Sequence, residues 1–190
     1  MKRLCQSAVR VGLAFRLVKR GPILLLLALS GSRAFTDNGQ SEYAVKGAFL
    51  YNFAKFVQWP AGAFADSSSP IVIGILGHDP SQGEIGNVIG SKTIEGRRVI
   101  VRLVATVRQA GAVQILFVPA NSMTKTDELA RIRNTSTLIV GDAENFARKY
   151  GEIGFVADGT RLGFEINATM ARASGLTISS KLLRLAKWVG

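Results

Sequence analysis

Between Glu42 and Trp59, apolar residues recur every three or four positions. This spacing predicts an amphipathic helix that buries one aromatic face. Pro60 cannot continue a helix, so the helix should end just before it. The predicted buried stripe consists of Val45, Phe49, Phe53, Phe56 and Val57.

Three continuous apolar runs follow, and each predicts a strand that is covered on both faces. They are residues 71–77 (IVIGILG), 114–119 (QILFVP) and 137–141 (TLIVG). A fourth run covers residues 98–104. In it, Val99, Val101 and Leu103 alternate with Arg98, Ile100 and Arg102, which is typical of a strand nearer the edge of a sheet.

Short helices are predicted between these strands. Asp79 is the predicted cap and Pro80 the predicted first-turn residue of a helix over residues 79–89. Residues 126–133 form a second predicted helix. Asp142 is expected to cap a third helix, over residues 143–150.

The last part of the chain contains two further helix signals. Asn167 can cap a helix that Gly175 ends by adopting a left-handed conformation. Ser179 or Ser180 can cap the next helix. The apolar stripe of that helix consists of Leu182, Leu183, Ala186 and Val189.

The order of these elements predicts the fold class. Residues 154–157 and 161–166 flank Asp158–Gly159, a strong hairpin signal. Strands that alternate with helices, followed by a hairpin and terminal helices, predict an α/β fold. We expect a single-domain three-layer sandwich whose mixed sheet has a parallel centre and an antiparallel hairpin at one edge.

Residues 1–34 have the pattern of a secretory signal peptide. Basic residues precede an apolar core at 23–29, and a small-x-small triplet ends at Ala34. Cleavage is expected after Ala34, with Ser30 as the alternative. The apolar core is shorter than the roughly 20 residues of a membrane span. A retained membrane anchor and a start codon downstream of Met1 remain open as alternatives.

Removal of residues 1–34 changes the charge and the cysteine content. The chain has 24 basic and 13 acidic residues, but seven of the basic ones and none of the acidic ones lie in this segment. The mature part therefore has 17 basic and 13 acidic residues, or +4, which gives no support for nucleic-acid binding. Residues 36–41 are polar, residues 35–41 are expected to be disordered, and residues 42–190 are expected to form the domain. The only cysteine, Cys5, lies in the predicted signal.

The residue types that carry catalysis or bind metals are sparse. A cluster of glycines (Gly74, Gly77, Gly83 and Gly86) matches neither the dinucleotide fingerprint nor the P-loop, and tight turns explain it more simply. His78 is the only histidine, so no metal cluster or Ser-His-Asp triad can include a second one. We therefore expect no catalytic, cofactor-binding or metal-binding residues.

Two polar groups near the carboxy terminus have simple structural interpretations. Glu165 is expected to form a salt bridge with Arg161, rather than an acid/base pair with Asp158. Ser179-Ser180-Lys181 is interpreted as a helix cap rather than a Ser/Lys nucleophile.

Two blocks at the ends of the predicted domain resemble the YfiR family of small periplasmic proteins. They are VKGAFLYNFAKFVQWP at 45–60 and FEINATMARASGLTISSKLLRLA at 164–186. Between them, PIVIGILGHDP, VQILFV and TLIVGD occur in the order of the family's strand and loop elements. The resemblance covers essentially the whole mature chain.

This resemblance implies a non-enzymatic regulator, exported to the periplasm. It would bind the periplasmic sensor domain of an inner-membrane diguanylate cyclase and repress it, which lowers cyclic di-GMP and biofilm formation. Some relatives accompany sensor histidine kinases, so a kinase is an alternative partner, and a homodimer is plausible by resemblance. Many relatives have a Cys-His pair where this chain has Val113-Gln114, so thiol-based redox control is not expected here.

Partner contacts are expected on polar residues that have no evident core role. We predict Arg161, Glu165, Ser179, Ser180 and Lys181 as partner-binding residues. The alternative function is a periplasmic protein that binds a small ligand, suggested by the glycine-rich turn at 74–86 and the aromatic helix.

Overall fold

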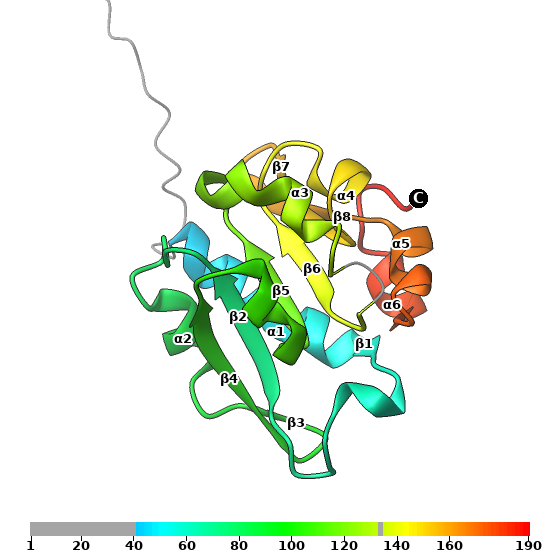
Figure 1. Cartoon of the computed structure of the whole chain (residues 1–190). Helices are drawn as coiled ribbons and strands as arrows, with labels where there is room; N and C mark the ends of the chain where they lie inside the picture. The colour runs from blue at the N-terminus through cyan, green and yellow to red at the C-terminus, as the bar shows by residue number, and fades with distance from the viewer. Residues whose placement is uncertain (1–40, 133–134) are drawn as a thin grey trace, which may run out of the picture. The chain divides into compact units, whose positions relative to one another are not determined.

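Strands and short helices alternate in the computed structural model, which describes residues 41–132 and 135–190 (Figure 1). The strands are β1 (Val57–Gln58), β2 (Ile71–Leu76), β3 (Thr93–Ile94), β4 (Arg97–Val104), β5 (Ile115–Val118), β6 (Leu138–Gly141), β7 (Ile153–Asp158), β8 (Arg161–Ile166) and β9 (Thr177–Ile178). The α-helices are α1 (Glu42–Phe56), α2 (Glu84–Ile89), α3 (Thr126–Leu129), α4 (Phe146–Lys149), α5 (Ala168–Ala173) and α6 (Ser180–Leu183). Short 3₁₀ turns are η1 (Ala61–Ala63), η2 (Val107–Ala112) and η3 (Ala120–Lys125).

Two predictions for the amino terminus concern residues outside this description. The predicted signal peptide, 1–34, and residues 35–40 of the predicted disordered stretch lie outside the described residues. The last residue of that stretch, Ser41, is described and caps α1, because its Oγ accepts a hydrogen bond from the N–H of Ala44.

Seven strands form one mixed sheet in the order β3-β4-β2-β5-β6-β7-β8. Four adjacent pairs in the centre of this order, β4–β2, β2–β5, β5–β6 and β6–β7, are parallel. β8 pairs antiparallel with β7 through the hairpin, so the predicted parallel centre and antiparallel edge are confirmed. The other edge has a second antiparallel pair, β3 with β4, which the sequence did not reveal.

Helices cover both faces of this sheet, because successive side chains of its buried strands point to opposite faces and both sets are apolar. One face carries α1, α2, α5 and α6 and the other carries η2, α3 and α4, which gives three layers (Figure 1). The first core includes Leu50, Phe53, Ile73, Ile85, Phe117, Phe155, Phe164 and Leu182. The second includes Val72, Val107, Leu116, Leu129, Ile139 and Phe146.

The buried face of α1 follows the predicted stripe only in part, because Phe53 is buried as predicted but other positions of the stripe are not. Lys46, Leu50 and Ala54 are buried, whereas Val45 and Phe49 are only half-buried. The reason is that α1 packs against α2 as well as against the sheet. A Cβ on Gly47 would lie 3.2 Å from the Cα of Ile85, so a larger residue here would require α1 and α2 to move apart slightly.

The strand order reverses between β2 and β5. After β2 the chain crosses to β4 on one side, then returns to β5 and continues through β6 to β7 on the other side. In open α/β sheets, ligand sites lie outside the carboxyl ends of the strands near such a reversal. This edge is therefore where the fold itself favours a site.

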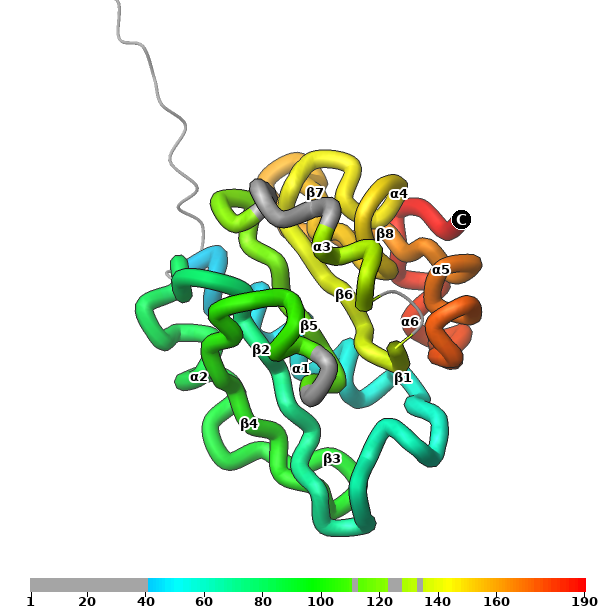
Figure 2. The backbone as a smooth tube through the Cα atoms, in the orientation of Figure 1, coloured from blue at the N-terminus to red at the C-terminus, as the bar shows by residue number. Residues whose placement is uncertain are grey.

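The carboxy-terminal segment follows the predicted caps. Asn167 Oδ1 accepts from the N–H of Met170 at 2.8 Å, and Ser179 Oγ accepts from the N–H of Lys181 at 3.3 Å. Gly175 has a φ of 73°, as predicted for a helix end. Beyond α6 the chain returns along β8, where the N–H of Ile166 donates to the carbonyl of Trp188 at 2.9 Å (Figure 2).

Across residues 41–132 and 135–190, no helix is both long enough and apolar enough to cross a membrane.

Candidate functional site

A groove of about 970 Å³ lies at the carboxyl ends of β5, β6 and β7. The amino-terminal half of α1 forms one wall and the β7–β8 hairpin forms the other. Its lining residues include Tyr43, Val45, Lys46, Phe49, Ala120, Asp142, Phe155, Thr160, Arg161 and Leu162.

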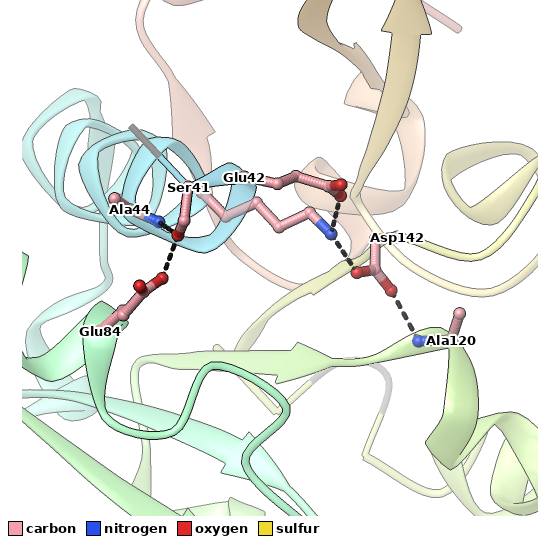
Figure 3. Close-up of polar contacts among 7 residues, drawn as sticks. Ser41, Glu42, Ala44, Glu84, Ala120 and Asp142 are labelled. Carbon is pink, nitrogen blue, oxygen red and sulfur yellow. Dashed lines mark hydrogen bonds and ion pairs between the residues drawn. The ribbon is translucent and has the colours of Figure 1, made fainter. Parts of the chain in front are cut away.

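Lys46 is the buried cation of this groove, with only 3% of its side chain exposed. Its Nζ lies 2.5 Å from Oδ2 of Asp142 and 2.7 Å from Oε1 of Glu42, one helical turn earlier in α1 (Figure 3). Burial lowers the pKa of Lys46, but the hydrogen bonds and charges of the two carboxylates outweigh burial, so its pKa lies above the ordinary value. Lys46 is thus a charged, fully engaged side chain.

Asp142 connects α1 to the carboxyl ends of two strands. It directly follows β6, and its Oδ1 accepts a hydrogen bond of 2.6 Å from the N–H of Ala120, two residues after β5 (Figure 3). The prediction that Asp142 caps a helix over 143–150 is wrong. The helix there, α4, is restricted to Phe146–Lys149 and is preceded by Asn145 in a left-handed conformation, while the carboxylate of Asp142 is used by Lys46 and Ala120.

Aromatic rings line the groove beside this ion-pair cluster. The Tyr43 ring centroid lies 4.8 Å from Nζ of Lys46. Burial raises the pKa of Tyr43, an effect that Lys46 opposes and the carboxylates of Asp142, Glu42 and Asp79 reinforce. Phe49 packs edge-on against Phe155 and Phe164, with centroid separations of 6.0 and 5.5 Å.

The charged groups of this cluster are paired with one another. The ammonium of Lys46 already binds two carboxylates, so it is not available as a free base, nucleophile or anion anchor. Within residues 41–132 and 135–190, no three His, Cys, Asp or Glu side chains are grouped in a way that could hold a metal ion.

The five predicted partner-binding residues do not gather at one place. Arg161 is exposed on the rim of the groove. Ser179 and Lys181 border a different hollow, of about 590 Å³, together with the end of α1. Ser180 is exposed at the first position of α6.

Glu165 has a structural partner, and it is not the predicted one. Its carboxylate forms two hydrogen bonds with the guanidinium of Arg148, at 2.7 and 3.0 Å, and this arginine also stacks 4.5 Å from the ring of Trp188. The predicted Glu165–Arg161 salt bridge is therefore wrong. Arg148 lies on α4, which packs over this face of the hairpin, and a pattern within one strand cannot reveal that contact.

Glu152 is a buried acidic residue that the sequence analysis did not single out. It is fully buried, and its carboxylate accepts hydrogen bonds from the N–H of Ile139 at 2.7 Å and from Ser174 Oγ at 2.8 Å. These bonds tie β6 to the end of α5, which indicates a structural role. A lone acid next to an apolar strand was the only signal in the sequence.

The glycine-rich turn after β2 is explained by backbone geometry. Gly77 has a φ of 77°, and a Cβ there would lie 2.9 Å from Ser122 Oγ. Asp79 accepts hydrogen bonds from the N–H groups of Ser81 and Gly83, so it stabilises the turn that precedes α2. The helix begins at Glu84, later than predicted, and ends at Ile89 as predicted.

Comparison with protein families gives a match over residues 43–187, which includes every element from α1 to α6. The matching model is described as YfiR/HmsC-like. The chain belongs to the YfiR/HmsC-like family. No curated protein matched the chain.

A solved structure shares its fold at low sequence identity. A conserved domain protein from Vibrio cholerae O1 biovar El Tor has a TM-score of 0.55 and 12% identity, over 79% of this chain and 60% of that one. An ABC domain from Streptococcus pneumoniae in complex with L-Trp has a TM-score of 0.45 and 16% identity, over 63% and 55% of the two chains. The chain thus spans little more than half the length of each of these two structures. The Vibrio cholerae structure is evidence for the fold alone.

Proposed function

We propose that the protein represses an inner-membrane diguanylate cyclase by binding the periplasmic sensor domain of that enzyme. The observation that carries this proposal is the match to the YfiR/HmsC-like family from Tyr43 to Lys187, nearly the whole described domain. The groove supports it indirectly, because its buried charges are already paired and a binding role remains for its rim. In this proposal the protein is not an enzyme and acts in the periplasm after export.

Arg161 is the proposed contact residue with the best position. It is exposed at the start of β8, beside the exposed hairpin tip at residues 157–160 and on the rim of the groove. Ser180 and Lys181 form a second, separate candidate contact on α6. Glu165 and Ser179 are proposed to act only by holding the surrounding structure, since both already make hydrogen bonds there.

Deletion of the gene tests the proposal. Cyclic di-GMP should rise in the deletion strain and return to the wild-type level when the gene is supplied on a plasmid. The Arg161→Glu variant should restore repression poorly. Arg131→Glu, which reverses an exposed arginine just after α3, is the matched control and should restore repression fully. Unchanged cyclic di-GMP in the deletion strain, with a changed output of a sensor histidine kinase, would instead assign the kinase as partner.

Binding of a small ligand is a second candidate function. It is favoured by the groove of about 970 Å³ at the carboxyl edge of a doubly wound sheet, with the aromatic walls of Phe49 and Phe155. Thermal-shift measurements against periplasmic metabolites test it. A Val45→Trp variant, which places a large ring in the groove, should abolish any stabilisation by a ligand that binds there.

A further inference from the structure

The two edges of the main sheet are protected to different degrees. At the β8 edge, the returning carboxy-terminal segment bonds to the strand, through Lys187 N–H to Phe164 carbonyl at 2.8 Å and Gly190 N–H to Ile166 carbonyl at 3.0 Å. At the β4 edge, β3 pairs with only Arg97 and Arg98. The rest of β4 pairs with β2 alone.

The backbone of β4 directs several groups away from the sheet. The carbonyl of Val104 faces β2, since it accepts from the N–H of Gly77 at 2.8 Å, whereas the N–H of Val99 faces outward to the carbonyl of Lys92 at 3.0 Å. Backbone groups of alternate residues point to the same side of a strand. Val101 and Leu103 therefore present their N–H and carbonyl groups outward, where no described strand pairs with them.

The side chains around this open edge are apolar and basic. Ile100 is 37% exposed and Leu103 is 60% exposed. Arg98 and Arg102 are exposed on either side of Ile100. A hollow of about 320 Å³ lies against the end of the strand, lined by Arg102, Leu103, Val104 and Gln109.

We infer that the outer edge of β4 binds an extended acidic segment of a partner protein by strand addition. Outward backbone groups provide the pairing, and acidic side chains at alternate positions complement Arg98 and Arg102. The hollow beside Leu103 takes one side chain of the added strand. This inference rests on β4 alone and not on the identity of the protein that the chain regulates.

A second copy of the chain is the less suitable occupant. When two β4 strands pair antiparallel through Val101 and Leu103, residues of the same parity meet on the same face. In the register that pairs Val101 with Leu103, Arg102 of one copy lies directly opposite Arg102 of the other, and like charges at such positions destabilise strand pairing. Charge complementarity therefore favours an acidic partner.

The test uses the purified protein and an acetylated, amidated heptapeptide that alternates glutamate with threonine and valine. The same peptide with lysine in place of glutamate is the control. In NMR titrations, the glutamate peptide should shift the amide signals of Val101 and Leu103 and slow their hydrogen exchange, and the lysine peptide should not. Binding elsewhere on the protein, equal binding of both peptides or no binding of either would overturn the proposal. A protein that is already dimeric through β4 would overturn it as well.

Two variants sharpen this test. Leu103→Pro removes one outward N–H. It should therefore lower the affinity for the glutamate peptide by roughly tenfold or more, which corresponds to the loss of about one hydrogen bond. The Arg98→Glu/Arg102→Glu variant leaves the backbone intact and should reverse the preference in favour of the lysine peptide. This double variant keeps the proposal testable if the proline variant does not fold. An unchanged preference for the glutamate peptide would contradict the proposal.

Discussion

Nζ of Lys46 lies 2.5 Å from Oδ2 of Asp142, although 96 residues separate them in the sequence. The contact joins the first helix of the domain to the carboxyl end of β6, and Asp142 extends it to Ala120 after β5. One buried ion pair therefore connects three elements that line the groove.

Loss of Lys46 should destabilise the fold. Lys46→Met leaves the carboxylate of Asp142, which is only 10% exposed, without its cation, so the free energy of unfolding should fall by about 3 kcal/mol. The Lys46→Met/Asp142→Asn double variant should lose less than the sum of the single variants, because it removes both charges. Denaturant unfolding measures both values, and simple additivity would contradict the coupling.

The contribution of Lys46 to stability should depend on pH only in the alkaline range. Because the pKa of Lys46 is raised in the folded protein, its contribution is complete below the unfolded-state pKa, near 10.5, and is lost as the pH rises through the folded-state pKa. The difference in unfolding free energy between wild type and Lys46→Met should stay constant from neutral pH to about 10 and then shrink.

Tyr43 provides the control for this pH dependence. Its pKa is also raised, so its titration weakens the fold in the same alkaline range. The measurement is therefore made in a Tyr43→Phe background. A difference that grows above pH 10 in that background would contradict the assignment to Lys46.

Gly77 should tolerate alanine less well than Gly159. Both have positive φ, of 77° and 63°, which costs about 1 kcal/mol for alanine. Only at Gly77 would the added Cβ meet another atom, Ser122 Oγ at 2.9 Å. Gly77→Ala should therefore lower the melting temperature further than Gly159→Ala, and Ser122→Ala should narrow this gap. Equal effects of the two glycine variants would contradict the proposed contact.

Glu165→Gln should have a small effect on stability. Its partner Arg148 is 44% exposed, so solvent screens the pair and its loss should lower the free energy of unfolding only slightly. Repression of cyclic di-GMP by the variant should be close to that of wild type, because we assign Glu165 to the packing of α4 and Trp188. A loss of repression with unchanged stability would return Glu165 to the set of partner contacts.

Local signals in the sequence were sufficient for the buried strands and for two of the helix caps, but not for β3 or for the role of Asp142. Asn167 and Ser179 cap helices as predicted, and the buried strands coincide with the continuous apolar runs. The site was not predictable in the same way. The partner of Lys46 is determined by the pairing of distant strands, and the predicted stripe, which contained Val45 and Phe49, did not include Lys46.

The same physical limit explains the error at Glu165. A strand pattern places Arg161 and Glu165 near each other, but only the packing of α4 against β7 brings Arg148 close enough to form the ion pair. Tertiary contacts of this kind decide which exposed-looking charges are structural and which remain for a partner.

Titration of the purified protein against purified periplasmic domains of the host's inner-membrane diguanylate cyclases and sensor kinases tests the central proposal most directly. We expect saturable binding to one cyclase domain, weakened by Arg161→Glu and unchanged by Arg131→Glu. Binding to no cyclase domain, or to a kinase domain alone, would contradict the proposal that the protein represses a cyclase.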